Sequence, residues 1–216
     1  MRSTAIAGLA GLMLLSGCGS LADGVDHDAS RKASLAPPEI HVTPCSTVEL
    51  VNFPSDAAGA ARAALDAACA VRRSQAFAAG AAARDWLPGC SILPLPNRRW
   101  VSGASVRDAM ADAGARFQLV YENPGAVAST SVGAQRMRIR PERFEGWLSG
   151  DPERRAALVN TLVHETTHLI SEPGRPGRFR YTDRGHGSWW CPDRDLVSYG
   201  LGDLAARTWR AMASEG

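Results

Sequence analysis

The sequence predicts an α+β domain that is rich in helices and contains a small mixed sheet. Of its 216 residues 45% are apolar, which is enough to bury one core. Several stretches place apolar residues at helical intervals, and shorter stretches alternate apolar and polar residues as strands do. Lys plus Arg number 24 against 22 Asp plus Glu, and the one long apolar run lies at the N-terminus. This balance excludes a strongly basic nucleic-acid-binding surface and a polytopic membrane protein.

The N-terminus has the features of an export signal. Arg2 supplies a positive charge, and residues 5–15 form an apolar stretch of signal-peptide length. The string Leu15-Ser16-Gly17-Cys18 resembles the lipobox of bacterial lipoproteins. That resemblance implies that the chain is cleaved before Cys18, which is diacylated and becomes the mature N-terminus. An ordinary secretory signal is the alternative, and export follows from either.

The three expected segments are a signal peptide over residues 1–17, a lipidated Cys18 with a flexible tether over residues 18–38, and a folded domain over residues 39–216. The tether is rich in Asp, Ser, Ala and Pro and nearly free of large apolar side chains, so it cannot pack. We therefore expect the domain at the cell envelope, lipid-anchored to the outer membrane or to the periplasmic face of the inner membrane.

The cysteine count agrees with export. Once Cys18 is set aside, Cys45, Cys69, Cys90 and Cys191 form an even number in an oxidising compartment, and two disulfides are expected. Their pairing stays open. A four-cysteine zinc site is the alternative, but the sequence contains no CxxC pair.

The elements before residue 150 follow from patterning. An Ala-rich region predicts one long helix or two in tandem, with a break near residues 74–80. Residues 135–140 alternate and predict an edge strand, which could bind an extended peptide by strand addition. The expected ranges are an extended segment at 42–53, helices over 55–86, a helix at 105–113, strands at 117–121 and 135–140, and a helix at 141–149.

The next helix contains the residues that predict chemistry. Asp151 is an N-cap, Pro152 suits the first helical position, and Pro173 limits the helix to about residue 172. Within it, residues 164–168 spell HETTH. Because residues i and i+4 share a helix face, His164 and His168 can bind one metal ion with Glu165 beside it. This is the zincin arrangement, in which Glu165 activates a zinc-bound water.

A catalytic zinc needs a third protein ligand. His186, between two glycines after the helix, is the first choice. Asp183 is expected to orient a ligand histidine, although it is also a candidate ligand. Glu172, Asp193 and Asp195 are the remaining alternatives.

These residues resemble the SprT-like or Spartan metallopeptidases. The HETTH helix, Asp183, Gly185-His186-Gly187 and Trp189 or Trp190 match that family's pattern over about residues 155–192. The resemblance implies Zn²⁺ bound by His164, His168 and His186, with Glu165 as general base.

The expected function is zinc-dependent hydrolysis of peptide bonds at the envelope, with a peptide or protein substrate and no nucleic acid. Tyr199 is the preferred donor to the oxyanion, ahead of Tyr181 and Arg184, and residues 201–212 predict a closing helix. Two alternatives remain: a zinc amidase acting on cell-wall peptides, and a non-catalytic, lipid-anchored binding or assembly module. The oligomeric state is left open.

Overall fold

The computed structural model describes residues 47–91, 99–113 and 116–214. The expected signal peptide, Cys18, the tether and Cys45 lie outside the described residues. Among the helices of the described ranges, none is both long enough and apolar enough to span a membrane.

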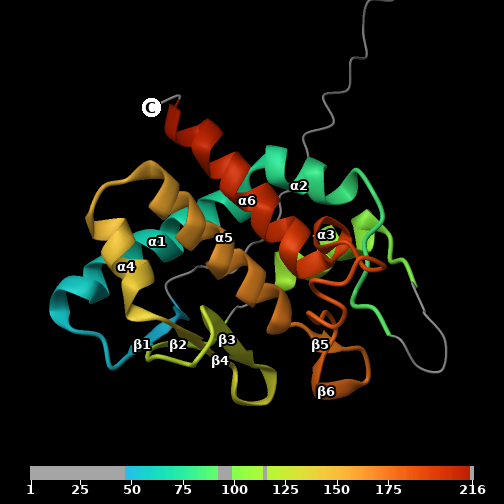
Figure 1. The fold of residues 1–216 in the computed structure, drawn as a ribbon, viewed down its shortest axis with the longest axis horizontal. Coiled ribbons are helices and arrows are strands. Elements are labelled where there is room, and N and C mark those ends of the chain that lie inside the picture. Colours follow the sequence, from blue (N-terminus) through green and yellow to red (C-terminus); the bar gives the residue numbers. More distant parts are fainter. Residues whose placement is uncertain (1–46, 92–98, 114–115, 215–216) are drawn as a thin grey trace, which may run out of the picture. The chain divides into compact units, whose positions relative to one another are not determined.

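The domain is α+β, with helices and a small mixed sheet as expected (Figure 1). The tandem helices after residue 55 are confirmed, with the break at Ser74, whose side chain caps the second helix. The helices are α1 (Ser55–Arg73), α2 (Gln75–Ala82), α3 (Gly103–Asp112), α4 (Pro141–Leu148), α5 (Pro152–His168) and α6 (Val197–Ser214). The strands are β1 (Glu49–Val51), β2 (Gln118–Tyr121), β3 (Ala128–Ser131), β4 (Arg136–Ile139), β5 (Ser171–Glu172) and β6 (Arg175–Phe179).

The main sheet has the strand order β1-β2-β4-β3. β1, β2 and β4 are parallel, and β3 runs antiparallel to β4 with Thr130 opposite Met137. Met137 and Ile139 alternate with arginines and are fully buried. The expectation that residues 135–140 form an edge strand is wrong, because β3 pairs with β4 on its outer side and is itself the edge.

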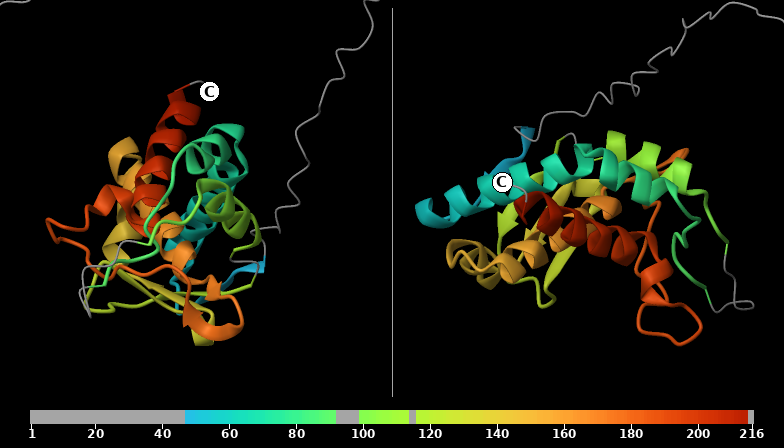
Figure 2. Two further views of the ribbon diagram at one scale, coloured as in Figure 1. Left: turned by 90° about the vertical axis from the view of Figure 1, so that its right-hand side faces the viewer. Right: turned by 90° about the horizontal axis from the view of Figure 1, so that it is seen from above.

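Helices cover one face of this sheet (Figures 1 and 2). α5 contacts α6, α1 and α4, and its residues Leu158, Val159, Leu162 and Val163 are buried in the core. The Asp151 side chain accepts hydrogen bonds from the Glu153 and Arg154 backbone N–H groups and so caps α5 as expected. Burial of α5 between α6 and the sheet fixes the direction in which its C-terminal turn points.

α5 ends at His168, four residues earlier than the sequence suggested. Residues 171–179 turn back as the β5–β6 hairpin, with Gly174 at φ 73° in the turn after Pro173. A positive φ at this position favours glycine. The hairpin packs beside the short 3-10 turn η2 (Val132–Ala134), which follows β3.

One of the two expected disulfides joins Cys90 to Cys191. Cys69 is disulfide-bonded as well. The expectation of bridging cysteines is therefore confirmed for Cys69, Cys90 and Cys191.

Candidate metal centre

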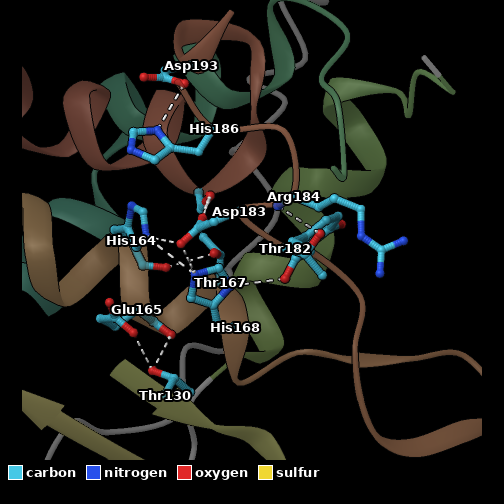
Figure 3. Close-up of polar contacts among 12 residues, drawn as sticks. Thr130, His164, Glu165, Thr167, His168, Thr182, Asp183, Arg184, His186 and Asp193 are labelled. Atoms are coloured by element: carbon cyan, nitrogen blue, oxygen red, sulfur yellow. Dashed lines mark hydrogen bonds and ion pairs between the residues drawn. The ribbon is translucent and has the colours of Figure 1, made fainter. Parts of the chain in front are cut away.

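Three side chains converge at the C-terminal end of α5 (Figure 3). His164 and His168 lie one helical turn apart, and their Nε2 atoms are 3.3 Å from each other. Asp183, from the segment between β6 and α6, places Oδ2 3.3 Å from each of these two nitrogens. These three residues form a group that could hold a metal ion.

The tautomer of His168 is set by its second nitrogen. Nδ1 lies 3.0 Å from the Tyr181 backbone carbonyl, which can only accept a hydrogen bond. In the neutral ring Nδ1 therefore carries the proton, and Nε2 presents a lone pair toward His164 and Asp183. An acceptor then faces the Asp183 carboxylate, so the arrangement requires a proton or a metal cation between them.

The charges of the metal-free group follow from this contact. Burial lowers the pKa of His168, but the hydrogen bond and negative charge of Asp183, with Glu165 and the Tyr181 carbonyl, raise it overall. Burial also opposes ionisation of Asp183, yet the two histidines hold the pKa of its carboxyl far below the ordinary range. The group is thus a carboxylate that attracts positive charge toward the two imidazoles.

Asp183 is itself held from α6. Its Oδ1 accepts a hydrogen bond of 2.6 Å from the Ser198 hydroxyl, and Ser198 is 1% exposed. Because Oδ1 is engaged by Ser198, Oδ2 is the oxygen directed at the histidines. Ser198 thereby fixes the rotamer that places Asp183 in the group.

Glu165 lies next to the group on α5 and is buried. Its Oε2 accepts a hydrogen bond of 2.6 Å from the Thr130 hydroxyl on the edge strand β3. Glu165, His168 and Asp183 line an open pocket of about 260 Å³, whose opposite walls come from β3 and from Phe179 of the hairpin. The Glu165 carboxylate therefore lines the same open pocket as His168 and Asp183.

The donor spacing fits a metal ion in tetrahedral coordination. Donors at about 2.0–2.2 Å from one ion in that geometry lie about 3.3–3.6 Å apart. All three donor separations here are 3.3 Å. Two imidazole nitrogens and one carboxylate oxygen leave the fourth position of a tetrahedral site open. The site can be reached from solvent, because the Asp183 side chain is 40% exposed.

His186, the first choice for the third ligand, is not brought to this group. Its Nδ1 lies 3.0 Å from Asp193 Oδ1 (Figure 3). Its ring stacks on Tyr199 with 4.3 Å between centroids. The donor in the third position is Asp183, to which the sequence had assigned mainly an orienting role. Within this segment the His186 backbone N–H bonds to the Asp183 carbonyl in a tight turn, and the two side chains have different partners.

The other candidate ligands have partners elsewhere. Glu172 on β5 pairs with Arg175 and Arg178, and Asp195 pairs with Arg84. Asp193 accepts from the Gly187 backbone N–H as well as facing His186. None of these carboxylates joins the His164, His168 and Asp183 group.

The candidate oxyanion donors differ in position. The Tyr199 ring lies edge-on to His164, with 4.6 Å between centroids. Burial and the nearby charges of Asp183, Asp193 and Glu165 raise the pKa of the Tyr199 phenol, so it stays protonated at neutral pH. Tyr181 is fully buried, and it contacts the metal group through its backbone carbonyl, which accepts the hydrogen bond from His168 Nδ1.

The segment that carries Asp183 is tied to a neighbouring segment. The Thr182 N–H bonds to the Pro88 carbonyl, and the Cys90 N–H bonds to the Arg184 carbonyl. The Cys90–Cys191 disulfide closes over Gly185, where a Cβ would lie 2.8 Å from the Cys90 Cβ. Asp183 is therefore positioned by backbone bonds and a covalent bridge on its C-terminal side.

Comparison of the chain with family models, curated proteins and solved structures returns no match. Two residues of the candidate site, Thr130 and Ser198, were missed in the sequence. Ser198 stands beside Tyr199 in a stretch that was noticed, whereas nothing in residues 128–131 signals a contact with Glu165.

Proposed function

We propose that the chain is a zinc-dependent metallopeptidase, zincin-like in fold, held at the bacterial cell envelope by the lipid on Cys18. The observation that carries the proposal is the convergence of His164, His168 and Asp183 beside a buried glutamate at an open pocket. Zn²⁺ suits two imidazoles and a carboxylate in a tetrahedral site with one open position.

Each protein group has a role that its contacts support. His164, His168 and Asp183 would hold a Zn²⁺ ion, with the Tyr181 carbonyl and the Ser198 hydroxyl orienting His168 and Asp183. When bound, this ion would supply Lewis-acid chemistry, polarising the substrate carbonyl and acidifying water. Glu165 accepts the proton that water loses, at Oε1 or Oε2, and delivers it to the leaving amine.

Thr130 and Tyr199 assist from the two sides of the group. The Thr130 hydroxyl donates to Glu165 Oε2 and fixes the direction of this carboxylate. Tyr199, kept protonated by the raised pKa of its phenol, is the donor that we assign to the oxyanion.

The edge strand β3 supports a peptide as the substrate. β3 pairs only on its β4 side within the described sheet, and three of its residues line the pocket that contains Glu165. Its free backbone N–H and C=O groups can pair with an extended peptide, which places a peptide bond beside Glu165. Strand addition, first assigned to residues 135–140, is thus assigned to β3.

The test compares the full chain with a Glu165→Gln variant. Zinc content is measured by elemental analysis, and hydrolysis is followed with a pool of fluorescence-quenched peptides. We expect about one zinc per chain in both proteins and a loss of about 10²- to 10⁴-fold in hydrolysis in the variant, because Gln cannot accept the proton. Glu153→Gln, an exposed change on the same helix, is the matched control.

The other outcomes separate the alternatives. Zinc without peptide hydrolysis, but with cleavage of cell-wall peptide amides that depends on Glu165, would assign an amidase. Zinc whose removal unfolds the chain, with no activity sensitive to Glu165→Gln, would assign a structural metal in a binding module. A chain that takes up no zinc would refute the proposal.

A further inference from the structure

The open pocket lined by Glu165, His168 and Asp183 is called the metal pocket here. A second pocket lies next to it and is lined by three arginines. Arg99, Arg180 and Arg184 surround a space of about 210 Å³ together with the Pro88 to Ser91 segment and Thr182. Thr182 lines both this pocket and the metal pocket. We call the second space the arginine pocket.

Residues of one short segment after β6 contribute to both pockets. Arg180, Thr182 and Arg184 line the arginine pocket, whereas Tyr181 between them is buried in the core and Asp183 belongs to the metal group. Asp183 of the metal group is therefore flanked in sequence by Thr182 and Arg184, which line the arginine pocket. In Figure 3 the Arg184 side chain points away from His164 and His168.

The positive charge of this pocket is not neutralised within the described part of the chain. Among the described residues no carboxylate lines the pocket, and none of their ion pairs involves Arg99, Arg180 or Arg184. Arg180 donates to the Ser105 hydroxyl and lies 5.3 Å from the centre of the Tyr181 ring, so it is held in place by neutral groups. Like charges gathered in a concave site attract an anion.

We propose that the arginine pocket binds a carboxylate of the peptide substrate, and so gives the enzyme a preference for an acidic group a few residues from the cleaved bond. This inference rests on the proposed function for the identity of the substrate as a peptide. Arg guanidinium groups suit carboxylates because their N–H donors match the two oxygens. The carboxylate is that of an Asp or Glu side chain or that of the substrate's C-terminus.

Thr182 gives the geometric link between the two pockets. A peptide paired with β3 passes Glu165 and His168 in the metal pocket, where Thr182 forms part of the wall. Since an extended peptide advances about 3.3 Å per residue, a side chain or terminus a few residues from the cleaved bond reaches past Thr182 to the arginines.

The experiment measures binding, so that it does not depend on hydrolysis. The full chain carrying Glu165→Gln is titrated with fluorescent peptides in which a single Glu or Gln is moved along a neutral background. A second series compares peptides that end in a free carboxylate or in an amide. Anisotropy at low salt gives each Kd.

We expect at least one acidic peptide to bind about tenfold or more tightly than its neutral counterpart, as charge-assisted hydrogen bonds predict. The position of the effective Glu, or its replacement by the free C-terminus, identifies which carboxylate is bound. The preference should disappear in Arg99→Ala/Arg184→Ala. It should persist in Arg154→Ala/Arg207→Ala, which removes two exposed arginines that do not line either pocket.

Equal binding of acidic and neutral peptides would overturn the inference, and so would the absence of measurable binding by any acidic peptide at millimolar concentration. A preference that survives Arg99→Ala/Arg184→Ala would assign it to another surface. Arginine-dependent binding in a chain that hydrolyses no peptide would leave the arginine pocket supported while refuting the proposed reaction.

Discussion

The hydrogen bond from Ser198 to Asp183 offers a direct measure of how the metal group is positioned. We expect Ser198→Ala to keep the fold but weaken zinc binding, because Asp183 then loses the contact that directs Oδ2 toward the histidines. The bond is 2.6 Å long and its donor is 1% exposed. A hydrogen bond to a charged acceptor contributes about 1.5–3 kcal/mol, which corresponds to about 10- to 150-fold in Kd. Since 40% of the Asp183 side chain is exposed, water can replace part of the bond, and the effect should lie near the lower end.

Zinc affinity is measured by competition with a chromophoric chelator, and the fold by circular dichroism and thermal unfolding. Thr208→Val is the matched control: Thr208 is also buried on α6, and its hydroxyl donates only to the Leu204 carbonyl one turn earlier. A folded Ser198→Ala chain that binds zinc within about twofold of the unchanged chain, well short of the tenfold effect of a charged hydrogen bond, would show that Ser198 does not position Asp183.

Three further predictions follow from contacts in the same region. Asp183→Ala should lose zinc while His186→Ala keeps about one zinc per chain; elemental analysis showing the reverse would restore His186 as the ligand. Tyr181→Phe should raise the free energy of unfolding by about 1 kcal/mol, because the Tyr181 hydroxyl is buried without a hydrogen-bond partner among the described residues; a lower value in chemical denaturation would show that this hydroxyl is bonded. With chelator present, the melting temperature should rise as the pH falls from about 8 to 6, because the raised pKa of His168 makes the folded chain bind more protons than the unfolded chain; a fall over this range would contradict the contact with Asp183.

The helices could be read from the sequence because each has a local cause. Asp151 and Pro152 mark the start of α5, and the break at Ser74 follows from a capping side chain. The edge strand β3 has no such signal. Its sequence, Ala-Ser-Thr-Ser, has neither large apolar side chains nor clear alternation, so its pairing with β4 depends on contacts distant in sequence.

The metal group shows the same division between local and distant causes. His164, Glu165 and His168 were found because helical periodicity places the two histidines on one face with the glutamate beside them. The choice between Asp183 and His186 depends on how residues 180–191 turn back toward α5. That path is set by backbone bonds to residues 88–90 and by the Cys90–Cys191 bridge, which no pattern within residues 180–191 encodes.

The Cys90–Cys191 bridge also decides what a proteolytic cut in the exposed β5–β6 hairpin would do. A cut after Arg175 leaves His164 and His168 on the N-terminal fragment with Cys90, and Asp183 on the C-terminal fragment with Cys191. The two fragments stay one covalent molecule, so the three donors remain at high effective concentration after the chain is broken. Such a nicked protein would migrate as two pieces only after reduction, and only then would the metal group depend on non-covalent packing to hold its third donor.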